Sequence, residues 1–299
     1  MKTVTEHKLF ATDPSAASKT KWLDSSRKNA ANGSLMRTHP LGIICVGKTR
    51  DETFEIAMEM SLVTHFDPRC AVSCCIVTAL VRGILRGEVL RETDVDDIIE
   101  AAYSFIDARP NVWDHPDPES PNKPLLDRKE FERHVYCAGL EALQLDDHYT
   151  MGYVYKALGA AVVTLRRGMR GDGFRELILE LVMEGGDADT NACIAGAVMG
   201  SWSGFAILPR EWRDGLKHRD WMMGIVEKLC CTIGIVEGEY KGSDDPDTAF
   251  DGGRGLLSEQ DMKQREKAFV HSIYAKMQIR DANKKAAEKE KKDKKWFSL

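Results

Sequence analysis

The sequence predicts an all-α protein, and three observations support that fold class. Apolar residues recur at helical spacing along most of the chain, as in the stripe formed by Phe54, Met58 and Leu62. No segment alternates apolar and polar residues in the way that a half-buried strand does. Segments 108–124 and 237–255 break the helical pattern with proline and glycine, which favour surface loops. We therefore expect one multi-helix domain.

The helical elements can be justified in order along the chain. Residues 49–65 contain the apolar stripe just described, with acidic residues at the amino end, where the helix dipole favours them. Residues 71–85 are apolar on nearly all sides, which predicts a central, buried helix. Thr93 followed by Asp96 resembles a capping box that opens a helix through Phe105. Further helical patterns cover 127–145, 150–167, 173–184, 189–204 and 219–237.

Length, charge and cysteine use narrow the class of protein. The chain has 299 residues, a formal net charge of -5 and 43% hydrophobic residues. It is long enough to bury a large core, and its charge gives no case for a general nucleic-acid binder. Its eight cysteines lie mostly in apolar helical runs without a CxxC pair, which indicates buried thiols in a reducing compartment. The start, MKTVTEHKLF, lacks an apolar signal-peptide core, and no uncharged apolar run reaches ~18 residues. We expect a cytoplasmic or otherwise intracellular monomer that binds neither nucleic acid nor a membrane.

The end of the chain differs in composition from the rest. Residues 258–299 form a highly charged helical pattern that passes into a Lys/Glu-rich tract. Such tracts are usually solvated or partly disordered, because they contain too few apolar residues to form a core. A partner-binding or coiled-coil helix is the alternative. We expect a helical domain over residues 1–257 and a charged helical or disordered tail over 258–299.

The segment GGDADTNACIAGAVMG, residues 185–200, places two carboxylates and a hydroxyl at the start of a predicted helix. Asp187 and Asp189 are two positions apart, so their side chains can converge where the chain is still extended. Thr190 adds a neutral oxygen, and hard oxygen donors of this kind suit magnesium, calcium or manganese better than zinc or copper. The glycines at 196, 200 and 204 would let a neighbouring helix approach closely.

The same residues also have a purely structural interpretation. Gly185 and Gly186 can end one helix in the left-handed conformation, and Asp187 or Asp189 can cap the next helix. An EF-hand is excluded, because the sixth position counted from Asp187 is Ala192 where that loop needs glycine. From the residues alone, a helix cap and a metal site both remain open.

Three further segments, taken together with this one, resemble a known family. Residues 185–212 resemble the carboxy-terminal signature of the ADP-ribosylglycohydrolase family, the dinitrogenase reductase-activating and ADP-ribosylarginine/ADP-ribosylserine hydrolase group. NGSLMRTHPLGI (32–43) resembles the family's Asn-Gly-Ser/Ala-x-Met-Arg motif. SLVTHFDPRCAVSC (61–74) resembles its Thr-His-x-x-Pro helix junction, and GYVYKALGAAVVTL (152–165) resembles the Gly-Tyr-Val helix before the metal motif. Four motifs in the family's order are far more specific than any single one.

The resemblance implies an orthogonal all-α bundle around a binuclear magnesium site, with manganese as the alternative metal. In that family the metals hold the ribose beside the scissile bond, a water attacks the anomeric carbon, and ADP-ribose leaves a protein side chain. Metal ions suit this reaction, because they orient sugar hydroxyls and lower the pKa of a bound water. The implied partner is ADP-ribose or an ADP-ribosylated protein, and the implied activity is that of an ADP-ribosyl glycohydrolase.

The resemblance also assigns two sets of residues to the site. The family's carboxy-terminal metal ligands correspond to Asp187, Asp189 and Thr190. The residues that surround the nucleotide correspond to Asn32, Gly33, Ser34, His65 and Tyr153. In this second set the first three match the loop near the phosphates, the histidine matches one that lines the nucleotide pocket, and the tyrosine matches an aromatic near adenosine or ribose. Each also has a structural alternative, since Asn-Gly is a good turn and the two rings can serve a helix end and the core.

The sequence departs from the family in one respect that bears on catalysis. The family's remaining metal ligands and its usual catalytic carboxylate lie in a Gly-Asp-x-x-Gly segment and a Thr-Asp-Asp motif before the Asn-Gly motif. Neither occurs before Asn32, since Thr12-Asp13 is followed by Pro14. We therefore expect only half of the binuclear site and assign no catalytic residue. Either the chain is part of a longer protein, or it is a shortened member that binds ADP-ribose or another partner without catalysis.

Overall fold

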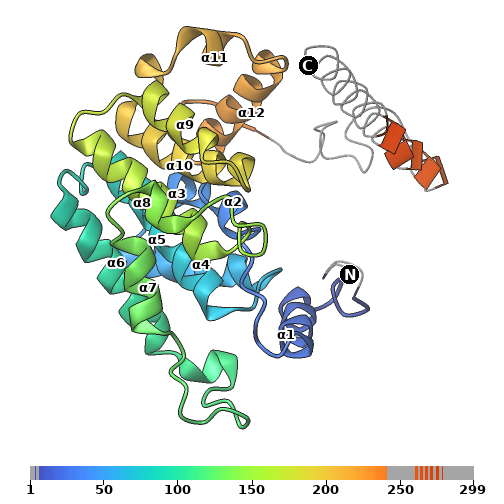
Figure 1. Ribbon diagram of the computed structural model, residues 1–299. Helices are drawn as coiled ribbons and strands as arrows, with labels where there is room; N and C mark the ends of the chain where they lie inside the picture. Colours follow the sequence, from blue (N-terminus) through green and yellow to red (C-terminus); the bar gives the residue numbers. More distant parts are fainter. Residues whose placement is uncertain are drawn as a thin grey trace, which may run out of the picture. The chain divides into compact units, whose positions relative to one another are not determined.

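The computed structural model describes Val4, residues 7–240 and separate positions between 260 and 278. The chain divides into two compact units, Met1–Arg219 and Asp220–Leu299. The described residues form helices and turns without a β-strand, and two isolated β-bridges join Ala31 to Tyr153 and Asp117 to Ser120. The predicted all-α fold class is confirmed (Figure 1).

The first unit contains the helices that build the candidate site. In chain order they are α1 (Pro14–Asp24), α2 (Leu35–Thr38), α3 (Leu41–Ile44), α4 (Arg50–Leu62), α5 (Pro68–Leu85), α6 (Glu92–Asp107), α7 (Arg128–Val135), α8 (Val154–Met169), α9 (Phe174–Met183), α10 (Ala188–Ser203) and α11 (Arg210–Asp214). Helix α12 (Arg219–Thr232) belongs to the second unit except for its first residue. The predicted boundary between domain and tail, at 257/258, lies outside the described residues and stays a prediction.

Helix α5 is the central element of the first unit. It begins directly after Asp67, whose carboxylate accepts a hydrogen bond from the Arg69 backbone N–H at 2.9 Å and so caps the helix. Helices α2, α3, α4, α6, α8 and α10 pack around it. Although α5 is long and apolar enough to span a membrane, 83% of it is buried within the protein, which is typical of a core helix. The predicted central helix is confirmed through Gly83, after which Leu85 reaches solvent.

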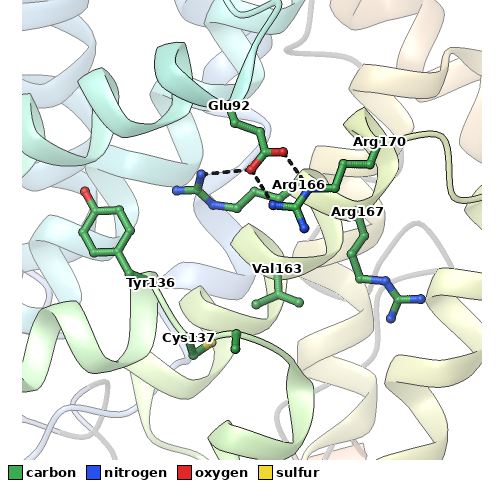
Figure 2. A pocket seen from close by; sticks show the side chains of 8 residues that line it. Glu92, Tyr136, Cys137, Val163, Arg166, Arg167 and Arg170 are labelled. Atoms are coloured by element: carbon green, nitrogen blue, oxygen red, sulfur yellow. Dashed lines mark hydrogen bonds and ion pairs between the residues drawn. The ribbon is translucent and has the colours of Figure 1, made fainter.

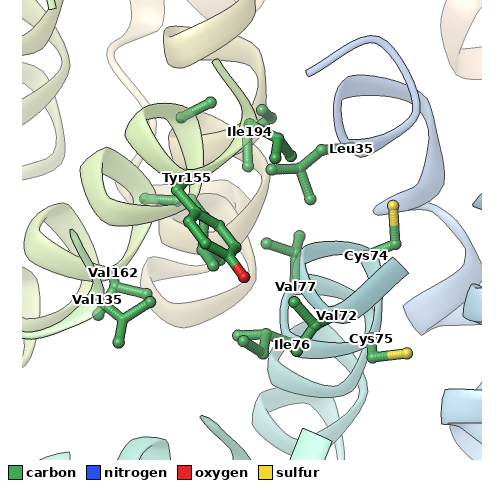
Figure 3. Packing of buried hydrophobic residues seen from close by; sticks show 14 of the residues in the cluster. Leu35, Val72, Cys74, Cys75, Ile76, Val77, Val135, Tyr155, Val162 and Ile194 are labelled. Atoms are coloured by element: carbon green, nitrogen blue, oxygen red, sulfur yellow. The ribbon is translucent and has the colours of Figure 1, made fainter. Parts of the chain in front are cut away.

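The core between α5 and α8 fixes the helices that lead to the candidate site (Figure 3). Tyr155 of α8 is fully buried, and its ring points toward the side of α5 that carries Val72. Leu35 of α2 and Ile194 of α10 are also fully buried and belong to the same apolar cluster. Burial of one large apolar side chain contributes about 1.5–3 kcal/mol. These contacts therefore hold the amino ends of α8 and α10 in place relative to α5.

The predicted capping box of Thr93 and Asp96 is wrong. Helix α6 begins one residue before Thr93, and Asp94 accepts hydrogen bonds from the backbone N–H groups of Leu90 and Arg91 at 2.9 and 2.8 Å. The earlier start of the first turn puts Asp94 opposite the unpaired N–H groups, so Asp96 cannot reach them.

Two other segments differ from their predicted form. The helical pattern at 127–145 is two elements, because α7 ends at Val135 and a separate 3-10 turn covers Leu140–Leu143. The proline-rich segment 108–124 is a loop apart from a 3-10 turn, which buries Trp113 completely. The Trp113 indole N–H donates to the carbonyl oxygen of Phe66 at 2.5 Å, and this hydrogen bond holds the loop against the connection between α4 and α5.

The glycines of α10 do not mediate close helix packing, contrary to the prediction. A Cβ placed on Gly196 or Gly200 would meet no atom of the described residues within 4 Å, so no described helix lies close against these two glycines. Close approach occurs instead at Gly42, where a Cβ would lie 2.6 Å from Val81 Cβ. Glycine is therefore required where α3 crosses α5, and the small residues of α10 need another explanation.

Candidate functional site

The turn between α9 and α10 sets the position of the acidic pair. Gly185 and Gly186 follow α9 with φ of +76° and +63°, a conformation that residues with a side chain rarely adopt. A Cβ on Gly186 would also overlap the carbonyl oxygen of Leu145. The predicted glycine stop is confirmed, and it leaves Asp187 at the N-cap position of α10.

The Asp187 carboxylate does not cap α10, although the residue occupies the capping position. Its Oδ2 accepts a hydrogen bond from Asn32 Nδ2 at 2.7 Å instead. Asn32 lies 155 positions earlier in the chain and is 6% exposed. This contact joins the Asn-Gly motif to the DADT segment.

Asp189 and Thr190 lie in the first turn of α10. Asp189 Oδ1 accepts a hydrogen bond from the Thr190 backbone N–H at 2.9 Å. Hydrogen bonding with the Asp187 carboxyl, and then with this backbone N–H, lowers the pKa of Asp189. Thr190 is buried, and its hydroxyl donates to Met36 Sδ at 3.7 Å. The two carboxyl groups are thus neighbours, while the threonine hydroxyl faces α2.

The loop before α2 is held against the start of α8. Asn32 N donates to the carbonyl oxygen of Gly152 at 3.0 Å, next to the β-bridge between the two segments. Ser34 is fully buried, and its hydroxyl accepts a hydrogen bond from Ser61 at 3.1 Å. The structure therefore brings Asn32 to the acidic pair but turns the Ser34 side chain into the core.

His65 follows α4 and lies against the Asn-Gly turn. If Gly33 carried a Cβ, that atom would be 2.9 Å from His65 Cε1, so only glycine leaves room for the ring. Burial lowers the pKa of His65 to about 4, and the positive charge of Arg37 adds to this effect. A neutral imidazole therefore borders the loop at physiological pH.

Tyr153 precedes α8 and belongs to a network of polar side chains. Its hydroxyl donates to Glu130 Oε1 at 2.9 Å, and the Arg69 guanidinium lies 5.6 Å from the centre of its ring. Arg69 makes a two-point ion pair with the fully buried Asp67, at 2.8 and 2.7 Å. Burial raises the pKa of Tyr153. The ring is thus fixed by its protein neighbours, one residue beyond the contact between Gly152 and Asn32.

A cavity of about 410 Å³ adjoins this network at the amino end of α5. Charged side chains of both signs line it, together with one aromatic wall; they include Trp22, Arg27, Asp67, Arg69 and Glu130. Its volume is within the range of small-molecule sites in proteins. The structure thus provides space for a polar ligand beside Arg69 and Glu130, the two side chains that contact Tyr153.

A second cavity of about 410 Å³ lies toward the carboxyl end of α8, where Val163 and Arg166 line it. Figure 2 shows three arginines there, Arg166, Arg167 and Arg170, together with Glu92. Arg170 makes a two-point contact with Glu92 at 2.7 and 2.8 Å, and the other two guanidiniums also have carboxylate partners. Arg166 and Arg170 pair with carboxylates of α6, and Arg167 pairs with Glu180 of α9, so we assign the cluster to the stability of the contacts that α8 makes with α6 and α9.

The polar residues that support the site side chains were not predicted from the sequence. Arg37 and Thr64 contact each other beside His65, while Arg69 and Glu130 hold Tyr153. Arg37 and Thr64 lie within the quoted motifs, which was the available signal for them. No sequence pattern pointed to Glu130, because its contact with Tyr153 depends on the packing of α7 beside α8.

The oxygen donors at α10 fit one hard divalent cation better than a binuclear centre. Asp187 and Asp189 offer carboxylate oxygens and Thr190 offers a hydroxyl, and water or phosphate oxygens commonly complete a magnesium site. Within the described part of the chain, no group of three or more His, Cys, Asp or Glu side chains could hold a metal ion. Among the described residues, this part of α10 therefore offers two neighbouring carboxylates to a cation.

Comparison with known proteins agrees with this geometry. The sequence profile of the ADP-ribosylglycohydrolase family matches residues 4–239, which include the Asn-Gly loop, the histidine junction and the acidic pair. The chain belongs to the ADP-ribosylglycohydrolase family. A segment of 59 residues is also 44% identical to an uncharacterized protein of Archaeoglobus fulgidus, covering 20% of this chain. The match spans 19% of that relative's length.

Proposed function

We propose that this protein acts on ADP-ribosyl compounds as a metal-assisted glycohydrolase that releases ADP-ribose from modified protein side chains. The hydrogen bond between Asn32 and Asp187 carries the proposal. It places a loop suited to a nucleotide beside a pair of carboxylates suited to a hard cation. Membership of the ADP-ribosylglycohydrolase family supports the class of substrate.

Each residue of the site has a defined task under this proposal. Asp187, Asp189 and Thr190 would hold Mg²⁺, or Mn²⁺ in its place, and such a cation supplies Lewis acidity to sugar and water oxygens. Asn32 orients the Asp187 carboxylate through its side-chain amide. His65 borders the turn at Gly33, and Tyr153 contacts Arg69 and Glu130, two of the residues that line the cavity at α5.

A second candidate function is ADP-ribose binding without hydrolysis. The observation that favours it is the number of acidic side chains at the site, since the described residues bring together two carboxylates and no larger metal-binding group. A two-metal mechanism needs more donors than these. A binding protein would use the loop at Asn32, His65 and Tyr153, and it would not need the further metal ligands.

The two functions are separated by one set of assays on the 299-residue chain. ADP-ribose release is measured from ADP-ribosylated arginine and serine peptides with and without Mg²⁺, beside calorimetric binding of free ADP-ribose. Magnesium-dependent release that is lost in Asp187→Asn and kept in Asp97→Asn, an exposed aspartate of α6, supports the hydrolase. Binding without release in any condition supports the second function, and absence of both contradicts each of them.

A further inference from the structure

His65 has a side-chain environment that fixes which of its ring nitrogens carries the proton. We propose that Arg37 and Thr64 are positioning residues, which hold His65 as the neutral Nε2–H tautomer so that it donates a hydrogen bond to a phosphate oxygen of the bound ligand. The inference rests on the proposed function for the identity of the ligand. The tautomer itself is a property of the free protein.

The hydrogen-bond pattern at Thr64 favours donation from the threonine hydroxyl to the histidine ring. Arg37 Nη2 donates to Thr64 Oγ1 at 2.6 Å and to the carbonyl oxygen of Met60 at 2.8 Å. Thr64 Oγ1 lies 2.8 Å from His65 Nδ1. A guanidinium can only donate, so it occupies an acceptor position of the hydroxyl. The hydroxyl keeps one proton, and among the described residues His65 Nδ1 is the acceptor within its reach.

A ring that accepts at Nδ1 carries its proton on Nε2 when it is neutral. Burial keeps the ring neutral by lowering the pKa of His65, and Arg37 acts in the same direction, whereas Asp67 opposes it. Arg37 lies on α2 and Asp67 directly precedes α5, so charged side chains from two elements act on the ring. The Nε2–H group is therefore the one donor of the ring.

The Nε2 edge of His65 faces the Asn-Gly turn. A Cβ on Gly33 would lie 3.0 Å from Nε2 and 2.9 Å from Cε1, so the ring packs directly against the backbone of this glycine. No described residue accepts a hydrogen bond from Nε2, whereas Nδ1 is engaged by Thr64. An available donor beside a turn next to a carboxylate half-site suits an anionic oxygen of a nucleotide.

Arg37 links α2 to the end of α4. A single nitrogen, Nη2, donates both to the carbonyl oxygen of Met60 and to the hydroxyl of Thr64. Its contact with Met60 anchors it to the last turns of α4, immediately before Thr64. The hydrogen bonds from Arg37 to Met60 and Thr64, and the contact of Thr64 with His65, therefore connect α2, α4 and the histidine.

The tautomer is tested by long-range ¹H–¹⁵N NMR of the imidazole in the full chain without ligand, for the wild type, Thr64→Val and Thr64→Ser. We expect His65 in the wild type to show a protonated Nε2 and an unprotonated Nδ1. Thr64→Val should produce a mixture of tautomers, and Thr64→Ser should restore the wild-type pattern. A protonated Nδ1 in the wild type, or an unchanged pattern in Thr64→Val, overturns the inference.

The consequence for binding is tested by calorimetry with ADP-ribose, on Thr64→Val, His65→Ala and the double variant. Thr64→Val should weaken ADP-ribose binding about five- to tenfold, and it should have no further effect in the His65→Ala background. Additive effects would show that Thr64 acts independently of His65 and would contradict the positioning role. A wild type that binds no ADP-ribose overturns the proposed function and the ligand contact, while the NMR pattern separately decides the tautomer.

Discussion

At the scale of single residues, the candidate site contains a carboxylate that contacts a distant residue and does not cap its own helix. Asp187 occupies an N-cap position, where a carboxylate normally accepts a hydrogen bond from the first turn of its own helix. Here the carboxylate contacts Asn32 and the neighbouring Asp189 instead. A cation bound between the two carboxyl groups would stabilise the ionised form of both. The arrangement is thus better suited to a ligand than to helix capping.

Substitution of Gly33 tests whether the His65 ring packs against the Asn-Gly turn. Gly33→Ala should destabilise the protein by about 1–3 kcal/mol, because the new Cβ falls 2.9 Å from the ring and forces it to move. Gly47→Ala is the matched control, since a Cβ there meets no atom of the described residues within 4 Å. Urea unfolding measures both variants. Equal stability of the two variants would show that the ring is not held against the turn.

The buried imidazole also makes a pH-dependent contribution to stability. The pKa of His65 falls from 6.5 to about 4 on folding, so folding favours the neutral ring. This contribution is complete above pH 6.5 and is lost as the pH falls toward 4. Linkage gives an effect on the order of 3 kcal/mol. Urea unfolding of the wild type and His65→Gln from pH 7.5 to 4 should give free energies whose difference shrinks over this window, and a constant difference would contradict it.

At the scale of elements, the two ends of α8 contact different parts of the molecule. Its amino end follows Tyr153 and lies beside the loop that carries Asn32, whereas its carboxyl end joins α6 through ion pairs. The apolar contacts with α5 lie between them. The helix therefore connects a polar site to a stabilising network without either depending on the chemistry of the other.

Removal of one charge from the α6–α8 network should change stability and leave the site intact. Glu92→Gln weakens the two-point contact with Arg170 and should cost about 0.5–1 kcal/mol at low salt, with a smaller cost at 1 M salt because exposed charges are screened. Glu59→Gln, an exposed residue of α4, serves as the control. Thermal unfolding and ADP-ribose affinity are measured together. A large loss of affinity in Glu92→Gln would contradict the structural assignment of this cluster.

At the scale of the whole molecule, the sequence predicts the fold class and most helices, because apolar periodicity reports burial directly. It predicts α5 as the buried centre for the same reason. Exact helix starts are less accessible, since Asp94 and Asp96 are equally good caps until the path of the chain into α6 is known. The small residues of α10 were also misleading, because an open face and a close helix contact both tolerate glycine.

The candidate site was only partly accessible from the sequence. Local spacing suggests that Asp187 and Asp189 are neighbours, but it cannot connect them to Asn32 across 155 positions. That connection came from resemblance to a family with the same order of motifs. The supporting contacts of Thr64 and Arg37 depend on how α2 packs against α4, which no local pattern specifies.

We propose that the acidic pair and the Asn-Gly loop form one cation-assisted site for ADP-ribose. Calorimetry of ADP-ribose with and without Mg²⁺, on the wild type and on Asp187→Asn/Asp189→Asn, tests this proposal. We expect Mg²⁺ to tighten binding to the wild type about tenfold, equivalent to about 1.4 kcal/mol, and to have no effect on the double variant. Affinity that is independent of Mg²⁺ in the wild type, or equally increased by Mg²⁺ in the double variant, would contradict it.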